Sequence, residues 1–396
     1  MTLLHNPTPT PTPHTTRLPP LTNTPLTGFA GFTDTLFGCL PRADQRKWAH
    51  LYVEALLRTP GKKSPRRLAE SVSASPTASQ ALHQFVNASP WDWTATRQAL
   101  LRRVARTGSA VTSWTLAPAF IPKRGDHSAG VHRRFDPLLG RLSNGQLGLV
   151  VLATGEHGPL PVDWHLYIPR GWTRARRSKA RVPEDISGPL WSQASELLGR
   201  APLWHPGAHA PVTAELSWLP DREAFLSQLV RSEQPFVVEV PDTVRVLPGA
   251  IPSTNWPTLT VRQVLMGPTV TGEDRQHVLS LPVSLPGPAS GHVRLRLLVR
   301  RRPCGSTRTW LTNMVDRRLP ELLPLMRQPR LAANVVDTLN GDFGLQDFEG
   351  RSYPGWHHHT TLVSAAFAYS RLRGRPLPDG DEFRDPSFPH GDGLCD

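Results

Sequence analysis

The sequence predicts an α/β protein with a helical region at each end of the fold and a mixed region of strands and helices between them. Three observations support this fold class. Apolar residues recur at three- and four-residue steps from about Thr33 to Leu56, which is the spacing of one buried helix face. From Ala110 the chain changes to short β-branched and apolar segments typical of strands. From Pro320 to about Arg373 the helical pattern returns.

Four parts follow one another along the 396 residues, which are enough for two or three domains with a sizeable core. Residues 1–30 form a Pro- and Thr-rich tail that has almost nothing to bury, so we expect it to be disordered. Residues 31–108 are expected to form a helical, DNA-binding-like domain and residues 109–372 the mixed core. Residues 373–396 form a C-terminal tail.

Start and stop signals locate the helices of the N-terminal domain. Pro60 and Gly61 end the first helical stretch. Ser64 is expected to cap the next helix, with Pro65 as its first residue. Further helices are expected at residues 78–86 and after the run SPWDW.

Five segments of the central region have strand character. They read SAVTSWTLA, NGQLGLVVLATG, LPVDWHLYIP, VRLRLLVRRR and STRTWLTNM. Between the third and the fourth, helical patterns cover residues 190–198 and 222–231. This order predicts a β-rich core with inserted helices.

The balance of charge favours a polyanionic partner. Lys and Arg number 45 against 32 acidic residues, which gives a formal net charge of +13 and a pI near 10.7. Nucleic acid is the first expectation and an anionic membrane surface the second. Arg exceeds Lys, and the planar guanidinium fits phosphates and base edges.

Cysteine usage and hydropathy favour a cytoplasmic protein without a membrane partner. Cys39, Cys304 and Cys395 are an odd number without metal-type spacing, which favours a reducing compartment. No apolar run reaches the ~18 residues that a membrane span needs. The N-terminus has no signal-peptide pattern.

Several basic segments are expected to contact DNA phosphates. Their members are Lys62, Lys63, Arg66, Arg67, Lys123, Arg124, Arg174, Arg176, Arg177, Arg294 and Arg296. On a strand, alternation places Arg294 and Arg296 on one face. For each segment the alternative is an ordinary solvated surface.

Six segments occur in one order along the chain: FVNASPWDW, AFIPKRGDHSAGV, NGQLGL, GPLPVDWHLYIPRGWT, VPED and GLQDFEGRSYPGWHHHTTL. Together they resemble the insertion-sequence 701 family of DDE transposases, within the insertion-sequence 4 group, over residues 34–372. The resemblance implies an RNase H-like core with a β-rich insertion, DNA as the partner and assembly as a homodimer. It also implies that Arg351 and His357 lie near DNA. Three adjacent histidines on a helix point in different directions, so His357 is not expected to share one metal ion with its neighbours.

In such enzymes two aspartates and a glutamate hold two divalent metal ions for an in-line phosphoryl displacement. The resemblance places the first aspartate at Ala117, because APAFIPK stands where the family has a pattern similar to Asp-Pro-Ser-Phe-Ile-Pro-Lys. Lys123 keeps the lysine of that pattern. The second aspartate corresponds to Glu215, and the glutamate to Ala333 when counted back from Gly344 without a gap.

Two of the three acid positions are therefore alanine, which has no oxygen to offer Mg²⁺. Asp337 lies one helical turn after Ala333 and is the stand-in that the sequence offers. Pro329 is expected to end or kink this helix. We therefore expect a DNA-binding protein that needs no metal cofactor and has lost two-metal strand cleavage and transfer.

Two alternatives stay open. One is an active metal-dependent transposase or nuclease that uses Glu215, Asp337 and a displaced acid with Mg²⁺ or Mn²⁺. The other is an interaction scaffold that has kept the fold and lost DNA.

Overall fold

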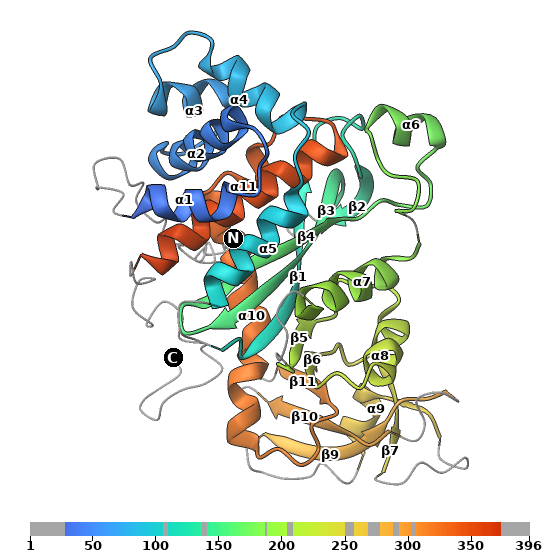
Figure 1. The fold of residues 1–396 in the computed structure, drawn as a ribbon. Helices are drawn as coiled ribbons and strands as arrows, with labels where there is room; N and C mark the ends of the chain where they lie inside the picture. Colours follow the sequence, from blue (N-terminus) through green and yellow to red (C-terminus); the bar gives the residue numbers. More distant parts are fainter. Residues whose placement is uncertain are drawn as a thin grey trace, which may run out of the picture.

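A long mixed β-sheet forms the centre of the computed structural model (Figure 1). The structure describes residues 28–105, 110–136, 141–186, 188–203, 209–249, 257–267, 278–287, 293–301 and 306–373. The predicted tails therefore lie almost entirely outside the described residues.

The sheet has a central part and an extension. Its strands are β1 (Ser113–Pro122), β2 (His132–Asp136), β3 (Arg141–Gly155), β4 (Gly158–Leu166), β5 (Val212–Glu215), β6 (Phe236–Glu239), β7 (Arg245–Pro248), β8 (Leu259–Thr260), β9 (Leu279–Ser284), β10 (Leu295–Arg301) and β11 (Thr307–Thr312). In the central part β3 pairs antiparallel with both β1 and β4, while β1, β5 and β6 are parallel. Beyond β6 the extension continues antiparallel through β11, β10, β9 and β7 to β8.

Helices cover both faces of the central strands (Figure 1). They are α1 (Phe29–Phe37), α2 (Ala43–Arg58), α3 (Pro65–Val72), α4 (Ala78–Asn87), α5 (Trp93–Ala105), α6 (Arg174–Lys179), α7 (Leu190–Leu203), α8 (Arg222–Arg231), α9 (Val261–Met266), α10 (Leu319–Gly341) and α11 (Tyr353–Leu372). One face packs against α10, α11 and the N-terminal helices α1 to α5, and these elements share one buried cluster. The other face packs against α7 and α8 in a second cluster. We call these the α11 face and the α7 face.

Local sequence signals explain several element boundaries. Ser64 caps α3 by accepting a hydrogen bond from the backbone N–H of Arg67, with Pro65 as the first helical residue, as predicted. Ser352 caps α11 in the same way, accepting from the N–H of Gly355 at 3.1 Å. Gly148 in β3 allows close packing, because a Cβ there would lie 2.9 Å from the ring of Trp356.

The predicted fold class is confirmed: the protein is mixed α/β, with helices before and after the strands. The expected helices at 78–86, 190–198 and 222–231 correspond to α4, α7 and α8. The helix does not end at Pro329, which was one of the two expected outcomes, because α10 continues through Pro324 and Pro329. A proline removes one helical hydrogen bond, and here the buried side of α10, to which Pro329 belongs, holds the helix against the sheet. The short strands β2 and β5 to β9 have too few residues for a period-2 pattern to identify them alone.

The boundary between the helical domain and the core, placed at residues 108 and 109, remains a prediction. The structure shows that α1 to α5 share their buried side chains with α11 and the sheet. Among the described helices, none combines the length and the apolar composition needed to cross a bilayer.

Candidate functional site

The two acid positions on the sheet lie side by side. Leu116 of β1 pairs with Ala214 of β5, so the next residues, Ala117 and Glu215, are neighbours across two parallel strands. Both belong to the α11 face, since Ala117 is part of its buried cluster and side chains alternate along a strand. Ala117 is only 4% exposed. A side chain at position 117 is therefore enclosed beside the carboxylate of Glu215.

Glu215 is half-buried at the end of β5. Its carboxylate accepts a hydrogen bond from the backbone N–H of Ser217 at 2.6 Å. Burial raises the pKa of Glu215, while this hydrogen bond acts in the opposite direction. The charge of nearby Glu239 raises the pKa further.

Glu239, which the sequence analysis did not single out, is the second acid at this end of the sheet. It pairs in register with Glu215 across β5 and β6. Arg308 of β11 donates two hydrogen bonds to its carboxylate, at 2.8 and 2.5 Å, and both side chains are 15% exposed. Arg308 thus neutralises the charge of Glu239 through a bidentate ion pair. A glutamate that ends the apolar run FVVE is the sequence signal that could have identified it.

The third acid position lies on α10. Ala333 and Asp337 both belong to the exposed stripe of this helix, one turn apart, whereas Ala332 and Val336 are buried beneath it. The side chain of Asp337 is exposed, yet neighbouring atoms desolvate it enough to raise its pKa. In the part of the chain that the structure describes, no three His, Cys, Asp or Glu side chains are grouped as a metal ion would require.

Lys123, the lysine retained after β1, connects the end of β1 to the loop that precedes α11. Its Nζ donates to the carbonyl of Phe348 at 2.7 Å, and the ammonium lies 5.9 Å from the centre of the Phe348 ring. Burial lowers the pKa of Lys123, while the charges of Asp347 and Glu349 oppose that effect. This lysine therefore holds the end of β1 against the loop that precedes α11.

Four of the predicted basic segments meet at one end of the molecule. Arg176 of α6 donates to the carboxylate of Asp126 at 3.1 Å, which joins α6 to the loop after β1. The N–H of Ala129 donates to the carbonyl of Arg351 at 2.9 Å, and this joins the same loop to the start of α11. The start of α3 is joined there as well, through a hydrogen bond of 2.7 Å from the N–H of Lys63 to the carboxylate of Asp347. We call this end, formed by residues 62–67, 123–128, 174–179 and 347–352, the basic rim; α3 and α6 mark it in Figure 1.

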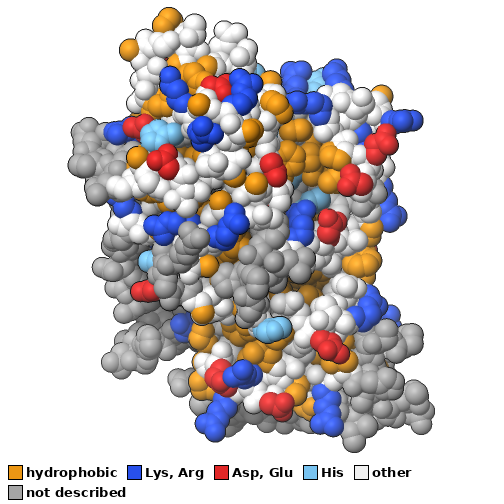
Figure 2. Space-filling model, in the orientation of Figure 1, with side chains coloured by type: hydrophobic (Ala, Val, Ile, Leu, Met, Phe, Trp, Pro, Cys, Tyr) orange, Lys and Arg blue, Asp and Glu red, His pale blue; other side chains and the backbone are white. Residues whose placement is uncertain are grey.

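The side chains of the basic rim divide into free and engaged ones. The side chains of Lys62, Arg124, Lys179 and Arg351 are exposed and make no hydrogen bond or ion pair with the described residues. The other exposed or half-buried arginines have partners within the molecule. Arg66 pairs with Glu70, Arg67 donates to the carbonyl of Pro60, Arg174 pairs with Glu184, Arg176 pairs with Asp126 and Arg177 donates to the carbonyls of Pro183 and Ile186. On the face shown in Figure 2, Lys and Arg are interspersed with Asp and Glu.

The structure corrects two of the predicted DNA contacts. Lys63 is 4% exposed, its ammonium donates to the carbonyl of Thr59, and burial lowers its pKa to about 8. His357 is 2% exposed and stacks on the ring of Trp93 at 4.9 Å. Both side chains are enclosed by neighbouring elements, so neither is available to a duplex.

Arg294 and Arg296 lie at the other end of the molecule, with β10 (Figure 1). Arg294 is exposed just before the strand, whereas Arg296 donates to the carbonyls of Val315 and Arg317, at 3.2 and 2.6 Å. The structure does not bring these two arginines to the basic rim.

A buried arginine that the sequence analysis missed joins α5, β4 and α11. Arg97 is 1% exposed and donates to the carboxylate of Asp163 at 3.0 Å. It also donates to the carbonyl of Trp164 at 2.9 Å and, from its Nη2, to Nδ1 of His357 at 3.1 Å. Desolvation lowers the pKa of Arg97 to about 10, a value at which it stays charged at neutral pH. An arginine inside an apolar helical stripe, together with an aspartate inside the apolar strand LPVDWHL, is the signal that could have revealed this pair.

The three adjacent histidines of α11 have three different environments, which explains why they do not form one metal site. His359 accepts from the hydroxyl of Tyr52 at 3.0 Å and donates to the carbonyl of Gly344 at 3.0 Å, so its neutral ring is fully satisfied. His358 lies with both ring nitrogens at carbonyl oxygens, 2.8 Å from that of Val86 and 3.0 Å from that of Trp91. A neutral ring can donate only one of these bonds. Burial lowers the pKa of His358, and the two carbonyls oppose that effect.

Comparison with known proteins gives the family. A sequence model described as "DDE superfamily endonuclease" matches residues 35–295, well over half of the chain. The chain belongs to the DDE endonuclease superfamily. The mixed sheet with its flanking helices is the RNase H-like architecture of this DDE protein, as the sequence resemblance implied.

Among solved structures, this DDE protein is similar to a piggyBac transposase in a cryo-EM structure of its synaptic complex with hairpin DNA. The two chains are 12% identical, with a TM-score of 0.39, over 95% of this chain and 86% of the other. None of the curated proteins matches the sequence.

Proposed function

We propose that this chain is a DNA-binding protein of the insertion-sequence 701 type that has lost the two-metal cleavage and transfer of DNA strands. One observation carries the proposal. Ala117, enclosed in β1 beside Glu215, occupies the place where the resemblance puts the first aspartate. A methyl group there supplies no metal ligand.

The surrounding carboxylates support the same conclusion. Two-metal phosphoryl transfer requires several oxygen ligands around a pair of divalent ions. The carboxylate of Glu215 accepts a hydrogen bond from the backbone N–H of Ser217, and that of Glu239 is bonded to Arg308. Asp337 lies on the exposed stripe of α10, and Ala333 adds no oxygen. The described residues therefore do not fit a pair of Mg²⁺ or Mn²⁺ ions, and the proposed role involves no metal cofactor.

DNA as the partner is supported by charge and by the assembly of the basic rim. The net charge of +13 favours a polyanion, and segments far apart in sequence contribute cations to one end of the molecule. Surface ion pairs such as Arg66–Glu70 contribute little to stability, so these arginines can exchange a carboxylate for a phosphate. A homodimer on DNA and a cytoplasmic location remain predictions from the sequence.

Nicking of supercoiled plasmid in the presence of Mg²⁺ or Mn²⁺ tests the loss of catalysis. We expect no nicking above the level of a Glu215→Ala variant. Metal-dependent nicking that Glu215→Ala abolishes would refute the proposal and support the alternative of an active nuclease.

Fluorescence anisotropy with a duplex of ~30 base pairs, repeated over a series of salt concentrations, tests DNA binding. The variant Lys62→Gln/Arg124→Gln/Arg351→Gln removes three of the free cations of the basic rim. Since each phosphate contact contributes about 0.9 to the slope of log affinity against log salt, we expect this slope to become shallower by about 2 to 3.

A matched triple variant makes the same change in net charge at the opposite end of the molecule. Arg231→Gln/Arg245→Gln/Arg262→Gln replaces exposed arginines of α8, β7 and α9. It should leave the slope nearly unchanged. Equal effects of both triple variants would assign binding to total charge alone, and absence of binding at low salt would favour the scaffold alternative.

A further inference from the structure

A hollow of about 390 Å³ opens on the α7 face of the sheet, away from Ala117. Its walls come from β2, β3, the segment that follows β4, the start of α7 and the loop that follows Glu215. Leu147 and Leu190, both of the apolar cluster on that face, contribute to its lining. Small-molecule sites have volumes of roughly 300 to 1,000 Å³, so this hollow is large enough for one nucleotide.

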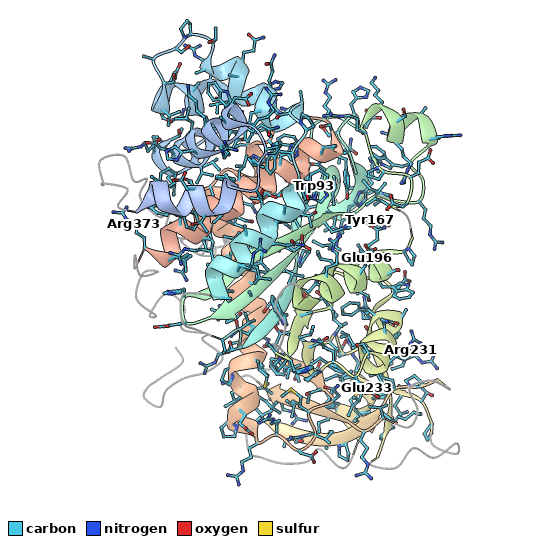
Figure 3. All side chains as sticks on the ribbon, in the orientation of Figure 1. Trp93, Tyr167, Glu196, Arg231, Glu233 and Arg373 are labelled. Carbon is cyan, nitrogen blue, oxygen red and sulfur yellow. The ribbon has the colours of Figure 1, made fainter. Side chains whose placement is uncertain are left out.

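Two aromatic side chains line the hollow. Tyr167 follows β4 and is half-buried, with the ring of His132 packed edge-on against it at a centre-to-centre distance of 5.6 Å. Figure 3 labels Tyr167, which lies between α6 and α7. Trp218, also half-buried, lies in the loop after β5, and Arg134 donates to its carbonyl at 3.2 Å. Nε1 of Trp218 is buried and has no hydrogen-bond partner among the described residues, so the wall contains an unsatisfied donor.

The charge of the hollow is positive. Arg170 is exposed and makes no hydrogen bond or ion pair with the described residues. Arg134 is half-buried, and burial lowers its pKa. Asp221 is the acid among the lining residues. The charge of Arg170 lowers the pKa of Tyr167, and the charge of Asp221 raises it. Arg133, Arg134 and Arg170 therefore share a small space with Tyr167, Trp218 and one carboxylate.

We propose that this hollow binds an unpaired nucleotide of single-stranded DNA, with its base stacked against Tyr167 and Trp218 and its phosphate at Arg134 and Arg170. A base inside a duplex is covered on both faces and cannot enter such a hollow, whereas an unpaired base offers its face to an aromatic side chain. The arginines fit the phosphate by charge and by their planar donor geometry. This inference rests on the proposed DNA-binding function and adds a second, strand-specific site to the duplex contacts of the basic rim.

Binding of a fluorescent 12-base single strand and of a blunt duplex to the full chain tests the proposal. We expect Tyr167→Leu and Arg170→Gln each to weaken single-strand binding about tenfold, because stacking on one aromatic ring and one charge-assisted phosphate contact are each worth about that factor. Duplex affinity should change less than about twofold. Thermal unfolding of both variants shows whether they remain folded.

Arg231→Gln is the matched control for Arg170→Gln. It removes the same charge from an exposed side chain of α8 that lies outside both the hollow and the basic rim. Single-strand binding should be weakened by Arg170→Gln and not by Arg231→Gln. Equal losses in the two variants, or none in either, would overturn the proposal.

A second measurement keeps the inference separate from the proposed function. A single strand that carries 2-aminopurine should lose fluorescence on binding the wild-type protein, because stacking quenches this base, and should lose less on binding Tyr167→Leu. Quenching that is equal in the two proteins would overturn the site even if DNA binds. Duplex binding with no effect at the hollow refutes this inference alone, whereas absence of any DNA binding refutes the proposed function as well.

Discussion

The two faces of the central sheet are stabilised in different ways. The α7 face is packed mainly by aliphatic side chains from β1, β3, α7 and α8. The α11 face contains, among its apolar residues, three histidines and several buried hydroxyls, and Arg97 of α5 forms a buried ion pair with Asp163 of β4 beside it. Buried polar groups are costly when they lose a partner. The stability of the α11 face therefore depends on particular hydrogen bonds and ion pairs, whereas that of the α7 face depends on how well its apolar side chains fill the space.

Removing Arg97 should have the largest effect. Arg97→Met leaves Asp163 buried with one partly exposed partner, Arg200 at 3.3 Å, and leaves Nδ1 of His357 without its donor. We expect a loss of about 4 kcal/mol in the free energy of unfolding, measured by urea denaturation. Leu197→Ala, the counterpart on the α7 face, should cost about 3 kcal/mol by creating a cavity.

A double variant tests whether Arg97 stabilises the protein through its ion pair or through packing. Replacing both charges, in Arg97→Met/Asp163→Leu, should recover part of the stability that Arg97→Met loses, because no unpaired charge then remains. If the single and the double variants were equally unstable, packing rather than pairing would explain the importance of Arg97.

Acid should destabilise the protein through its neutral buried histidines. Burial lowers the pKa of His165 and of His359 to about 4, below the value near 6.5 expected in the unfolded chain. The unfolded state therefore takes up protons first as the pH falls, and the free energy of unfolding decreases between about pH 6.5 and pH 4. From pH 7 to pH 5 we expect a loss of about 4 kcal/mol from these two residues together.

One variant distinguishes the contributions of the two histidines to this pH dependence. His165 is hydrogen-bonded to Gln193 of α7, whereas His359 belongs to α11. His359→Gln should reduce the dependence of stability on pH by about 1.4 kcal/mol per pH unit below pH 6.5. A dependence that is the same in the variant and the wild type would mean that His359 is already charged in the folded protein.

Ala117→Asp should destabilise the α11 face by about 2 kcal/mol at neutral pH. The new carboxylate would be enclosed beside Glu215, where burial and like charge both oppose ionisation. Ala117→Asn, of equal size and without the charge, is the matched control. If the two carboxylates form a partial metal site, Mn²⁺ should raise the melting temperature of Ala117→Asp and have no effect on Ala117→Asp/Glu215→Gln.

The smallest effect is expected at the surface. Arg66 and Glu70 form an ion pair one helical turn apart on α3, with side chains 85% and 59% exposed. Arg66→Gln should leave the urea midpoint of unfolding unchanged within experimental error, because an exposed ion pair contributes little to stability. A lower midpoint would show that the start of α3 contributes to the fold as well as to the basic rim.

Much of the fold could be predicted because its signals are local. The caps and periodicity that indicate α3, α4 and α8 lie within each segment, and the structure places these helices as expected. The short strands β5 and β6 could not be recognised in this way, because their pairing with β1 and β11 is made across large sequence separations. The run FVVE places Glu239 at the end of an apolar segment, but only the pairing of β5 with β6 makes it the neighbour of Glu215.

The sequence alone determined the order of helices and strands, the excess of positive charge and the absence of a carboxylate at position 117. Each of these is a property of residue identity or of short-range spacing. Tertiary structure decided which charged and aromatic groups face solvent: it enclosed Lys63 and His357, and it brought Tyr167 and Trp218 to one hollow. Burial and pairing depend on segments that are distant in the chain, so the same residue types are core in one place and accessible surface in another.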